Sequence, residues 1–502
     1  MSLSSALGII NSAFVANAAQ SAVISSNISN AGTKGYAREI ANLATITSGG
    51  VEVTSVGREA NAALLEQVNT STSQAAYQQA LSDGLTTLAN TVSDSSSATS
   101  SSGATANGNS PSAMLANLQS ALETYDASPS STSAAQGVVT AAADLTQSLN
   151  TGAAAVQSVR ETADSGMASA VNSINSLLTQ FTSVNATIVS GTAIGADVSS
   201  AQDTRDSILA QLSQQIGIST VSNPDGSTSI YTDSGVTLFQ GGSPRTVSFT
   251  PTATYTDGAT GNAVMVDGVP ITGASSPMAI QSGALAGLAN LRDVVAPQYG
   301  AQLDQIAGGL ISAFAESDQT GSATPAATLP GLFTFPGATG VPAITATTGL
   351  ASEIEVNANV DPSQGGDVNR LRDGGIADPT NSAYTYNTTN AASYTGRIAQ
   401  LISATTTNQT FGGTTGLGTS SSLSDYASSS VSWLQSQHQA ASNQLDYQNS
   451  LVSQATTAAS NATGVNLDTE MTNMLTIENS YTTTAKLLTT VNAMFTSLLN
   501  AV

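Results

Sequence analysis

The chain begins and ends in segments whose apolar residues recur every three or four positions, the spacing of one helix face. The N-terminal stripe, over residues 3–28, consists of Leu3, Leu7, Ile10, Phe14, Ala18, Ser21, Ile24 and Ile28. The C-terminal stripe consists of Leu467, Met471, Met474, Ile477, Tyr481, Ala485, Leu488, Val491, Phe495 and Leu498. Its step is close to the ~3.5 residues of coiled coils. Since isolated helices of this length are marginal in water, both ends must pack against something.

Two interpretations of these ends remain open. They could be ordinary helices of one globular core, or they could pair with each other and with other subunits. No charged residue precedes Lys34 and none follows Lys486. Each Leu or Phe that becomes fully buried contributes roughly 1.5–3 kcal/mol, enough over a whole stripe to offset the entropy of ordering. We favour the second interpretation, in which the ends order on polymerisation.

Between these ends the periodicity changes twice. Residues 39–56 have a hairpin-like pattern around Gly49-Gly50, and Gly464 interrupts the last helical stretch. Further helices are expected at 59–93, 111–125, 134–190, 203–216, 283–316, 395–405 and 423–461. Alternation and Asp-Gly turns predict a small β-rich region over 217–280. Loops are expected at 94–110 and 406–421, and 317–392 reads as irregular with a strand near 353–356.

This order predicts a mainly α, elongated, multi-domain chain with an inserted β-rich domain. The terminal helices would pair as a coiled coil in a core domain made of 1–38 and 464–502. A long-helix bundle domain would comprise 39–216, 281–316 and 395–463. A β-rich outer domain would comprise 217–280 and 317–394, at the far end of the bundle.

Composition excludes several classes of function. The net charge is −22 with only 11 basic residues, which disfavours nucleic acid and anionic membrane surfaces as partners. Cysteine is absent, so disulfides and thiolate chemistry are not possible. No unbroken apolar run reaches about 18 residues, and no basic segment precedes an apolar one. We therefore expect no membrane insertion and, if the protein leaves the cell, export without a cleaved signal peptide.

No catalytic, cofactor or metal site is expected. His438 is the only histidine, so a Ser-His-Asp triad or a zinc site would lack partners. The glycine-rich stretch 412–418 lacks the lysine of a phosphate loop and reads as a flexible linker. Asp361, Asp367 and Asp373 do not have EF-hand spacing. The charged segments Asp203–Asp206 and Arg292-Asp293 are expected to form surface ion pairs across the helical domain. We predict that the protein is not an enzyme.

The turn after the first stripe carries a recognisable motif. Residues 26–36 resemble the N-terminal signature of bacterial flagellar rod, hook and hook-associated proteins, usually Asn-Asn-Ile-Ala-Asn-Ala-Asn-Thr-Pro-Gly-Tyr/Phe. The matching residues are Asn27, Ile28, Asn30, Ala31, Thr33, Gly35 and Tyr36, and the departures are Ser26, Ser29, Gly32 and Lys34. Lys34 replaces the usual Pro. The run Gly464–Asp468, with Tyr481 and the final helix, is similar to the closing helix of the same family.

Internal segments resemble the family members that join the hook to the filament. These segments are Tyr36-Ala37-Arg38, Gly50–Val53, Arg58, Leu64-Leu65, Asp203–Asp206, Gly283–Leu288, Arg292-Asp293 and Leu303–Ala307. The resemblance implies a structural, motility-related subunit of the extracellular flagellum, exported by the flagellar type III apparatus. It also implies as partners the hook protein, the next hook-associated junction protein, further copies in a ring or tube, and a cytosolic export chaperone on the C-terminal helix.

The assembly interface is predicted from the two stripes and the turn. Its residues are Leu3, Leu7, Ile10, Phe14, Asn27, Asn30, Gly35, Tyr36, Leu467, Met471, Met474, Tyr481, Leu488, Phe495 and Leu498. The alternative within the family is a hook or distal-rod protein. A secreted adhesin or enzyme with its activity in 217–392 is the alternative outside it, although that span has no histidine.

Overall fold

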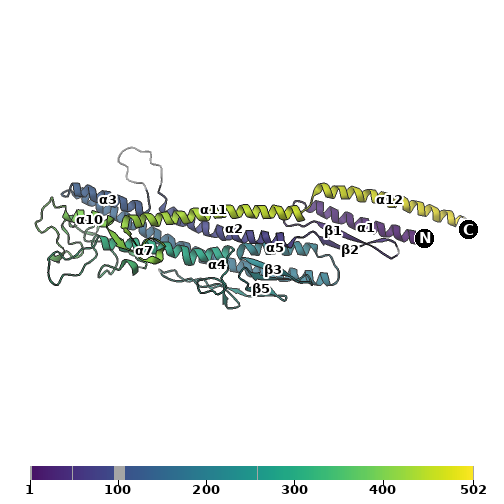
Figure 1. Cartoon of the computed structure of the whole chain (residues 1–502), viewed down its shortest axis with the longest axis horizontal. Coiled ribbons are helices and arrows are strands. Elements are labelled where there is room, and N and C mark those ends of the chain that lie inside the picture. Colours follow the sequence, from purple (N-terminus) through teal and green to yellow (C-terminus); the bar gives the residue numbers. More distant parts are fainter. Residues whose placement is uncertain (1–2, 48, 95–107, 257, 347, 501–502) are drawn as a thin grey trace, which may run out of the picture.

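The computed structural model describes residues 3–47, 49–94, 108–256, 258–346 and 348–500. The molecule is elongated, with both termini at the same end (Figure 1). Helix α1 (Leu3–Asn30) and helix α12 (Leu467–Leu499) lie side by side there and run antiparallel. Both stripes are helical as predicted. The side chain of Asn466 caps α12 by accepting the backbone N–H of Thr469, so the new helix begins at Leu467, soon after the break at Gly464.

A two-stranded hairpin covers one side of α1. It consists of β1 (Glu39–Thr45) and β2 (Val51–Arg58), with a register shift between Asn42 and Leu43. The Oγ of Ser12 on α1 accepts the N–H of Val51 at 3.1 Å. A Cβ on Gly50 would lie 2.4 Å from that hydroxyl oxygen, so glycine permits this approach. The predicted hairpin is confirmed, and it packs on the terminal pair.

The body is a bundle of long helices. Helix α2 (Ala62–Ala89), extended by the 3₁₀ turn η1 (Asn90–Val92), runs beside α11 (Leu423–Thr463). Helix α4 (Thr132–Ala193) spans most of the body and packs against α3 (Pro111–Ala127) and α5 (Ser199–Gln215). The helices predicted from the apolar periodicity are thus confirmed. Of the predicted loop at 94–110, residues 95–107 lie outside the described residues.

The β-rich region confirms the predicted change of period over 217–280. Four strands form one sheet in chain order: β3 (Ile218–Ser222), β4 (Thr228–Thr232), β5 (Thr237–Gln240) and β6 (Ser243–Pro244). A second, three-stranded sheet contains β7 (Val247–Ser248), β8 (Met265–Val266) and β9 (Val269–Pro270). All pairings are antiparallel. The region lies alongside α4 and α5, not at the far end of the bundle as expected, because its apolar face packs on the second half of α4.

The predicted helix over 283–316 is interrupted. Helix α6 (Ala284–Asn290) continues through a π-helical turn, η2 (Leu291–Val295), into α7 (Ala296–Ala313). Leu291 packs so close to α2 that a Cβ on Gly84 would lie 2.0 Å from its Cδ2. The π turn lies where two hydrophobic clusters meet along α4.

Short elements make up the far end. They are β10 (Phe333–Thr334), η3 (Ile344–Ala346), α8 (Leu350–Glu353), β11 (Glu355–Val356), η4 (Pro362–Gln364), α9 (Arg370–Asp373), η5 (Ser382–Tyr384) and α10 (Gly396–Thr406). The predicted strand near 353–356 pairs with β10. The stretch 406–421, expected to be a loop, forms a hairpin of β12 (Asn408–Thr410) and β13 (Ser420–Ser422) around η6 (Gly413–Thr415).

The core is divided along α4. The first half of α4 shares one hydrophobic cluster with α3, α7, α10, α11 and residues between 332 and 376. The second half shares another with α5, α6 and the β-rich region. Residues 217–280 and 317–394, grouped in one outer domain from the sequence, therefore contribute to different clusters. The domain boundaries themselves stay a prediction.

Candidate assembly surface at the paired ends

Helices α1 and α12 hold each other through their predicted stripes. The rings of Phe14 and Tyr481 have centroids 5.5 Å apart at 50°. The amide of Asn17 donates to the Oγ of Ser480 at 3.1 Å. The buried residues of α12 are spaced seven apart, as in a helix that faces a single partner. They are Glu470, Ile477, Thr484 and Val491.

The signature turn connects the two helices to the hairpin. The buried Asn27 side chain pairs with the backbone of Glu39: its Nδ2 donates to the carbonyl and its Oδ1 accepts the N–H, each at 2.9 Å. The Tyr36 hydroxyl donates to the same Oδ1 at 2.9 Å, and Asn27 also donates to Glu470 at 3.3 Å. An amide is needed here because these contacts use both its donors and its acceptor.

Charges complete this junction. The Nε of Arg38 donates to Oε1 of the buried Glu470 at 2.6 Å, and its Nη1 lies 3.3 Å from Glu59. The hydrogen bond with Glu470 raises the pKa of Arg38. Burial raises the pKa of the Glu39 carboxyl, and the nearby Asp197 adds to this. The interface predicted from the sequence did not include Arg38, Glu39 or Glu470, because a charged residue usually indicates a solvated surface.

The remaining turn residues shape the backbone. The amide of Asn30 donates to the carbonyl of Ser26 at 3.0 Å. Gly35 has φ 85°, a conformation that favours glycine. Lys34, which replaces the usual Pro, is exposed next to it.

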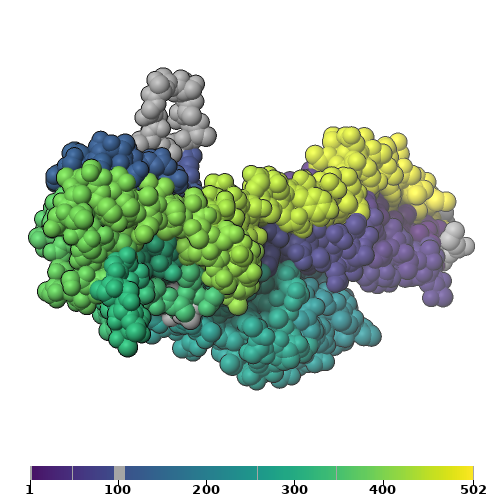
Figure 2. Space-filling view, turned by 60° about the vertical axis from the view of Figure 1, so that its left-hand side comes forward, coloured from purple at the N-terminus to yellow at the C-terminus, as the bar shows by residue number. Residues whose placement is uncertain are grey.

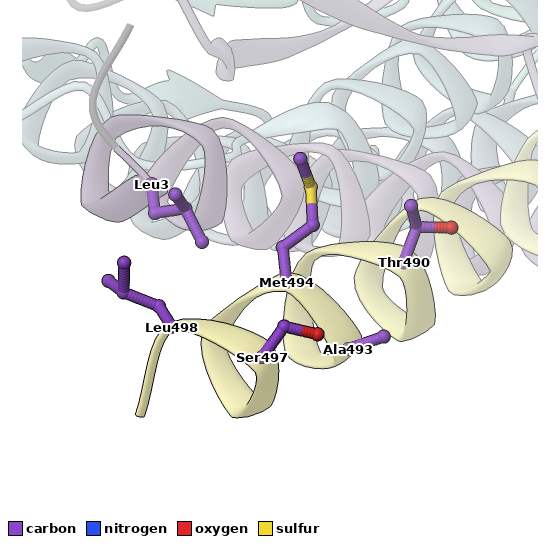
Figure 3. Close-up of a pocket in the computed structure, with 6 residues that line it drawn as sticks. All are labelled: Leu3, Thr490, Ala493, Met494, Ser497 and Leu498. Atoms are coloured by element: carbon purple, nitrogen blue, oxygen red, sulfur yellow. The ribbon is translucent and has the colours of Figure 1, made fainter. Parts of the chain in front are cut away.

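Large apolar side chains remain exposed on the outside of the pair, and α12 lies over α1 at the projecting end of the molecule (Figure 2). On α12 they are 47–76% exposed and form two groups, one near its start and one near its end: Leu467, Met471 and Leu475, and Leu487, Met494, Leu498 and Leu499. On α1, Val15 is 69% and Leu7 is 37% exposed. Leu3, Met494 and Leu498 line an apolar hollow at the tip, where Leu3 and Leu498 point toward each other (Figure 3).

The predicted interface residues thus divide into two sets. One set is buried or half-buried within the chain: Leu3, Ile10, Phe14, Asn27, Asn30, Tyr36, Met474, Tyr481, Leu488 and Phe495. Residues left exposed are Leu7, Gly35, Leu467, Met471 and Leu498. Val15, Leu475, Leu487 and Met494 are exposed too but lie off the predicted stripes. These four residues do not follow the repeat of the stripes, so only their own apolar character could have identified them from the sequence.

Helix α1 is long and apolar enough to cross a membrane by length and composition. This differs from the expectation, which relied on unbroken apolar runs and so overlooked a segment containing scattered Ser and Asn. Core helices of soluble proteins and signal sequences share these properties. In this structure one face of α1 packs against α12 and the hairpin.

No group of three metal-ligating His, Cys, Asp or Glu side chains occurs within the described ranges. The Nε2 of His438 on α11 lies 3.1 Å from the Thr86 hydroxyl on α2. In the glycine-rich stretch, the Thr415 carbonyl accepts the amides of Gln298 and Gln302 on α7 at 3.0 and 2.9 Å. This segment is anchored on the bundle rather than being the flexible linker expected.

Comparison with known proteins relates the chain to flagellar components. Residues 101–331 match the family "Flagellar hook-associated protein FlgK helical domain", and residues 457–501 match "Flagellar basal body rod FlgEFG protein C-terminal". Flagellar hook-associated protein 1 of Salmonella typhimurium is 24% identical over 319 residues, 59% of this chain and 54% of that protein. Its Escherichia coli namesake is 23% identical over 326 residues, 61% of this chain and 56% of that protein.

A solved structure, that of the flagellar hook junction protein FlgK from Burkholderia pseudomallei, covers 54% of this chain and 46% of its own, with 20% identity and a TM-score of 0.41. The chain spans about half the length of the curated relatives that it matches. By these matches the chain is similar to bacterial flagellar rod and hook-associated proteins. Among them, it is similar to flagellar hook-associated protein 1.

Proposed function

We propose that this chain is a structural subunit of the bacterial flagellum that forms the junction between hook and filament. The observation that carries the proposal is the pair of terminal helices, held together by their inner stripes while large apolar residues remain exposed outside. Leu475, Leu487 and Met494 would lose contact with water when copies pack side by side, at about 25 cal/mol per Å² of apolar area. The spacing of seven on α12 supports coiled-coil-like packing.

The role is structural rather than enzymatic, and the protein acts outside the cell after export by the flagellar apparatus. Its partners are the hook protein, the next hook-associated protein and further copies in a ring or tube. An export chaperone holds the C-terminal helix in the cytosol, where its exposed apolar groups need cover. The match of 101–331 to the hook-associated helical domain favours the junction over a hook or rod role.

The exposed face is tested with the double substitution Leu475→Gln and Leu487→Gln in the full chain. Both side chains point outward, so the isolated protein keeps its circular dichroism and thermal unfolding. In a strain of the source bacterium lacking the native copy, we expect few filaments and flagellin released into the medium. The matched control is Ile194→Gln with Val221→Gln, which removes two exposed apolar residues elsewhere. Normal filaments in the first variant would contradict a role for this face.

Deletion of residues 467–502 tests whether the subunit lies at the hook–filament junction or in the hook or rod. The junction proposal predicts complete hooks without filaments. Loss of the hooks themselves would favour the hook or rod alternative. Normal filaments would overturn the flagellar assignment altogether.

A further inference from the structure

Arg58, at the end of strand β2, reaches from the hairpin to helix α5. Its Nη1 and Nη2 donate to the carboxylates of Asp203 and Asp206, respectively. The Arg58 side chain is only 8% exposed and the two aspartates are 15% and 12% exposed. A guanidinium suits this position because its planar fork can serve two carboxylates at once.

This ion cluster lies between the terminal pair and the bundle. The hairpin packs on α1, whereas α5 packs on α4 and α2. The chain passes between the two parts through residues 59–61, between β2 and α2, and again through Gly464–Asn466, which separate α11 from α12. At the second crossing, a Cβ on Gly464 would lie 2.4 Å from the Ser460 carbonyl oxygen, so the sharp break needs glycine. The N–H of Arg38 donates to the Thr463 carbonyl and the Arg38 carbonyl accepts the N–H of Glu59, each at 2.8 Å, so Arg38 connects the two crossings.

Without Arg58 the cluster would be strongly negative. Asp203 and Asp206 lie three residues apart on one helix face, where like charges repel. Glu39 and Asp197 add negative charge nearby: burial, and then repulsion from Asp197 and Asp203, raise the pKa of the Glu39 carboxyl. Arg205 lies 3.4 Å from Asp206, and the burial of Asp203 raises the pKa of its carboxyl. The chain has only 11 basic residues, and Arg38, Arg58 and Arg205 lie at this junction.

We propose that Arg58, Asp203 and Asp206 form an ionic latch that fixes the direction of the terminal helix pair relative to the bundle. Gly464–Asn466 is the hinge about which the pair turns when the latch is open. The latch acts within one chain, so it does not depend on the proposed place in the flagellum. It gives the subunit a device that sets the angle at which its terminal helices are presented to neighbours.

The test uses the full chain, whose lack of cysteine allows clean spin labelling at two introduced sites. Gln214→Cys on α5 and Thr483→Cys on α12 are both exposed positions on opposite sides of the hinge. Pulsed electron–electron double resonance then gives the distribution of distances between the two spin labels. We expect one narrow population in the otherwise native chain, and a broader, shifted distribution with Arg58→Ala. The control Arg245→Ala opens an exposed pair with Asp267 in the β-rich region and leaves the distribution unchanged.

Exchanging the charges of Arg58 and Asp206 tests whether the ion pair itself, rather than the shape of the side chains, fixes the angle. Arg58→Asp combined with Asp206→Arg is expected to narrow the distribution again, relative to Arg58→Asp alone. If Arg58→Ala does not fold, the near-isosteric Asp203→Asn with Asp206→Asn is measured instead and is expected to broaden the distribution. A distribution that stays narrow in a folded variant without the ion pairs would overturn the latch, because packing alone would then set the angle.

Discussion

Glu470 and Arg38 connect the two ends of the chain across 432 residues of sequence, with the Arg38 Nε donating to Oε1 of Glu470 at 2.6 Å. Glu470 is wholly buried at the start of α12, and its Oε2 accepts from Asn27 on α1. One carboxylate therefore joins the first helix, the signature turn and the last helix. It also lies in the first turn of α12, where a negative charge is favourable.

Replacing Glu470 by Ala removes the acceptor from both Arg38 and Asn27. Because hydrogen bonds to charged groups contribute roughly 1.5–3 kcal/mol, we expect the terminal pair to lose about 2 kcal/mol of stability. Amide hydrogen exchange in α1 and α12 measures this, with faster exchange expected in both helices. Glu478→Ala, on an exposed position of the same helix, is the control and should leave exchange unchanged. Equal effects of the two substitutions would show that Glu470 acts only through helix propensity.

Gly464 and Gly137 offer a matched pair of substitutions to Ala. A Cβ at 464 meets the Ser460 carbonyl oxygen, whereas a Cβ at 137 on α4 finds nothing within 4 Å. Gly137→Ala should stabilise the chain by about 0.5–1 kcal/mol, since glycine weakens a helix interior by that amount. Gly464→Ala should destabilise it, by roughly 1 kcal/mol or more. Urea unfolding of the two variants measures both effects. A gain in stability at 464 would mean that the helix break tolerates a side chain.

Apolar periodicity in the sequence predicts the helices of this fold but not how they pack together. It locates helices such as α4 and α12, because a buried face repeats whatever it packs against. It does not say which partner covers that face, so the β-rich region was expected at the far end rather than beside α4. The π turn at Leu291–Val295 is not predicted, because one extra residue in a turn leaves the apolar pattern nearly intact. The β12–β13 hairpin is not predicted, because a sequence rich in Ser and Thr is typical of a loop.

The candidate surface was predicted in part for a similar reason. The stripes identify residues such as Phe14 and Tyr481, which meet between the helices. Exposed residues such as Leu475 lie off the stripe and carry no periodic signal. The charged segments Asp203–Asp206 and Arg292-Asp293 do not pair with each other: Asp203 and Asp206 pair with Arg58, and Arg292 pairs with Asp164 and with the neighbouring Asp293. Contacts between residues so far apart in the chain follow from the tertiary arrangement alone.

The buried pair of Arg292 and Asp164 is expected to be the most sensitive ionic contact in the body. The Nη1 of Arg292 donates to Asp164 at 2.6 Å, and the Tyr255 hydroxyl donates to the same carboxylate oxygen at 2.8 Å. Asp164→Ala leaves the fully buried guanidinium with Asp293 but without this partner. We expect a loss of about 3–5 kcal/mol in urea unfolding, the usual effect of breaking a buried pair.

The control for Asp164 is Arg245→Ala, which breaks the exposed pair with Asp267 and should change stability by about 0.5 kcal/mol or less. Tyrosine fluorescence and circular dichroism both follow the unfolding. If Asp164→Ala behaved like Arg245→Ala, then the attachment of Thr252 and Tyr255 to α4 would rest on apolar packing and not on this ion cluster.

Glu316 at the far end should make stability depend on pH. Its side chain is wholly buried, one oxygen accepts the N–H of Ala377 at 2.9 Å, and burial raises the pKa of its carboxyl above the usual 4.5. A carboxyl whose pKa is higher in the folded state binds its proton more tightly there. Its contribution to stability is therefore fully present below about 4.5 and is lost as the pH rises through the folded pKa.

Glu316→Gln removes this titration and keeps the shape. As the pH falls from 7 toward 4.5, the native chain should gain free energy of unfolding relative to the variant. Urea unfolding at a series of pH values gives this difference directly, and Glu123→Gln on the exposed side of α3 is the matched substitution at the surface. A difference for Glu316→Gln that changes in the opposite direction would mean that the backbone donors of residues 375–377 outweigh burial and stabilise the carboxylate.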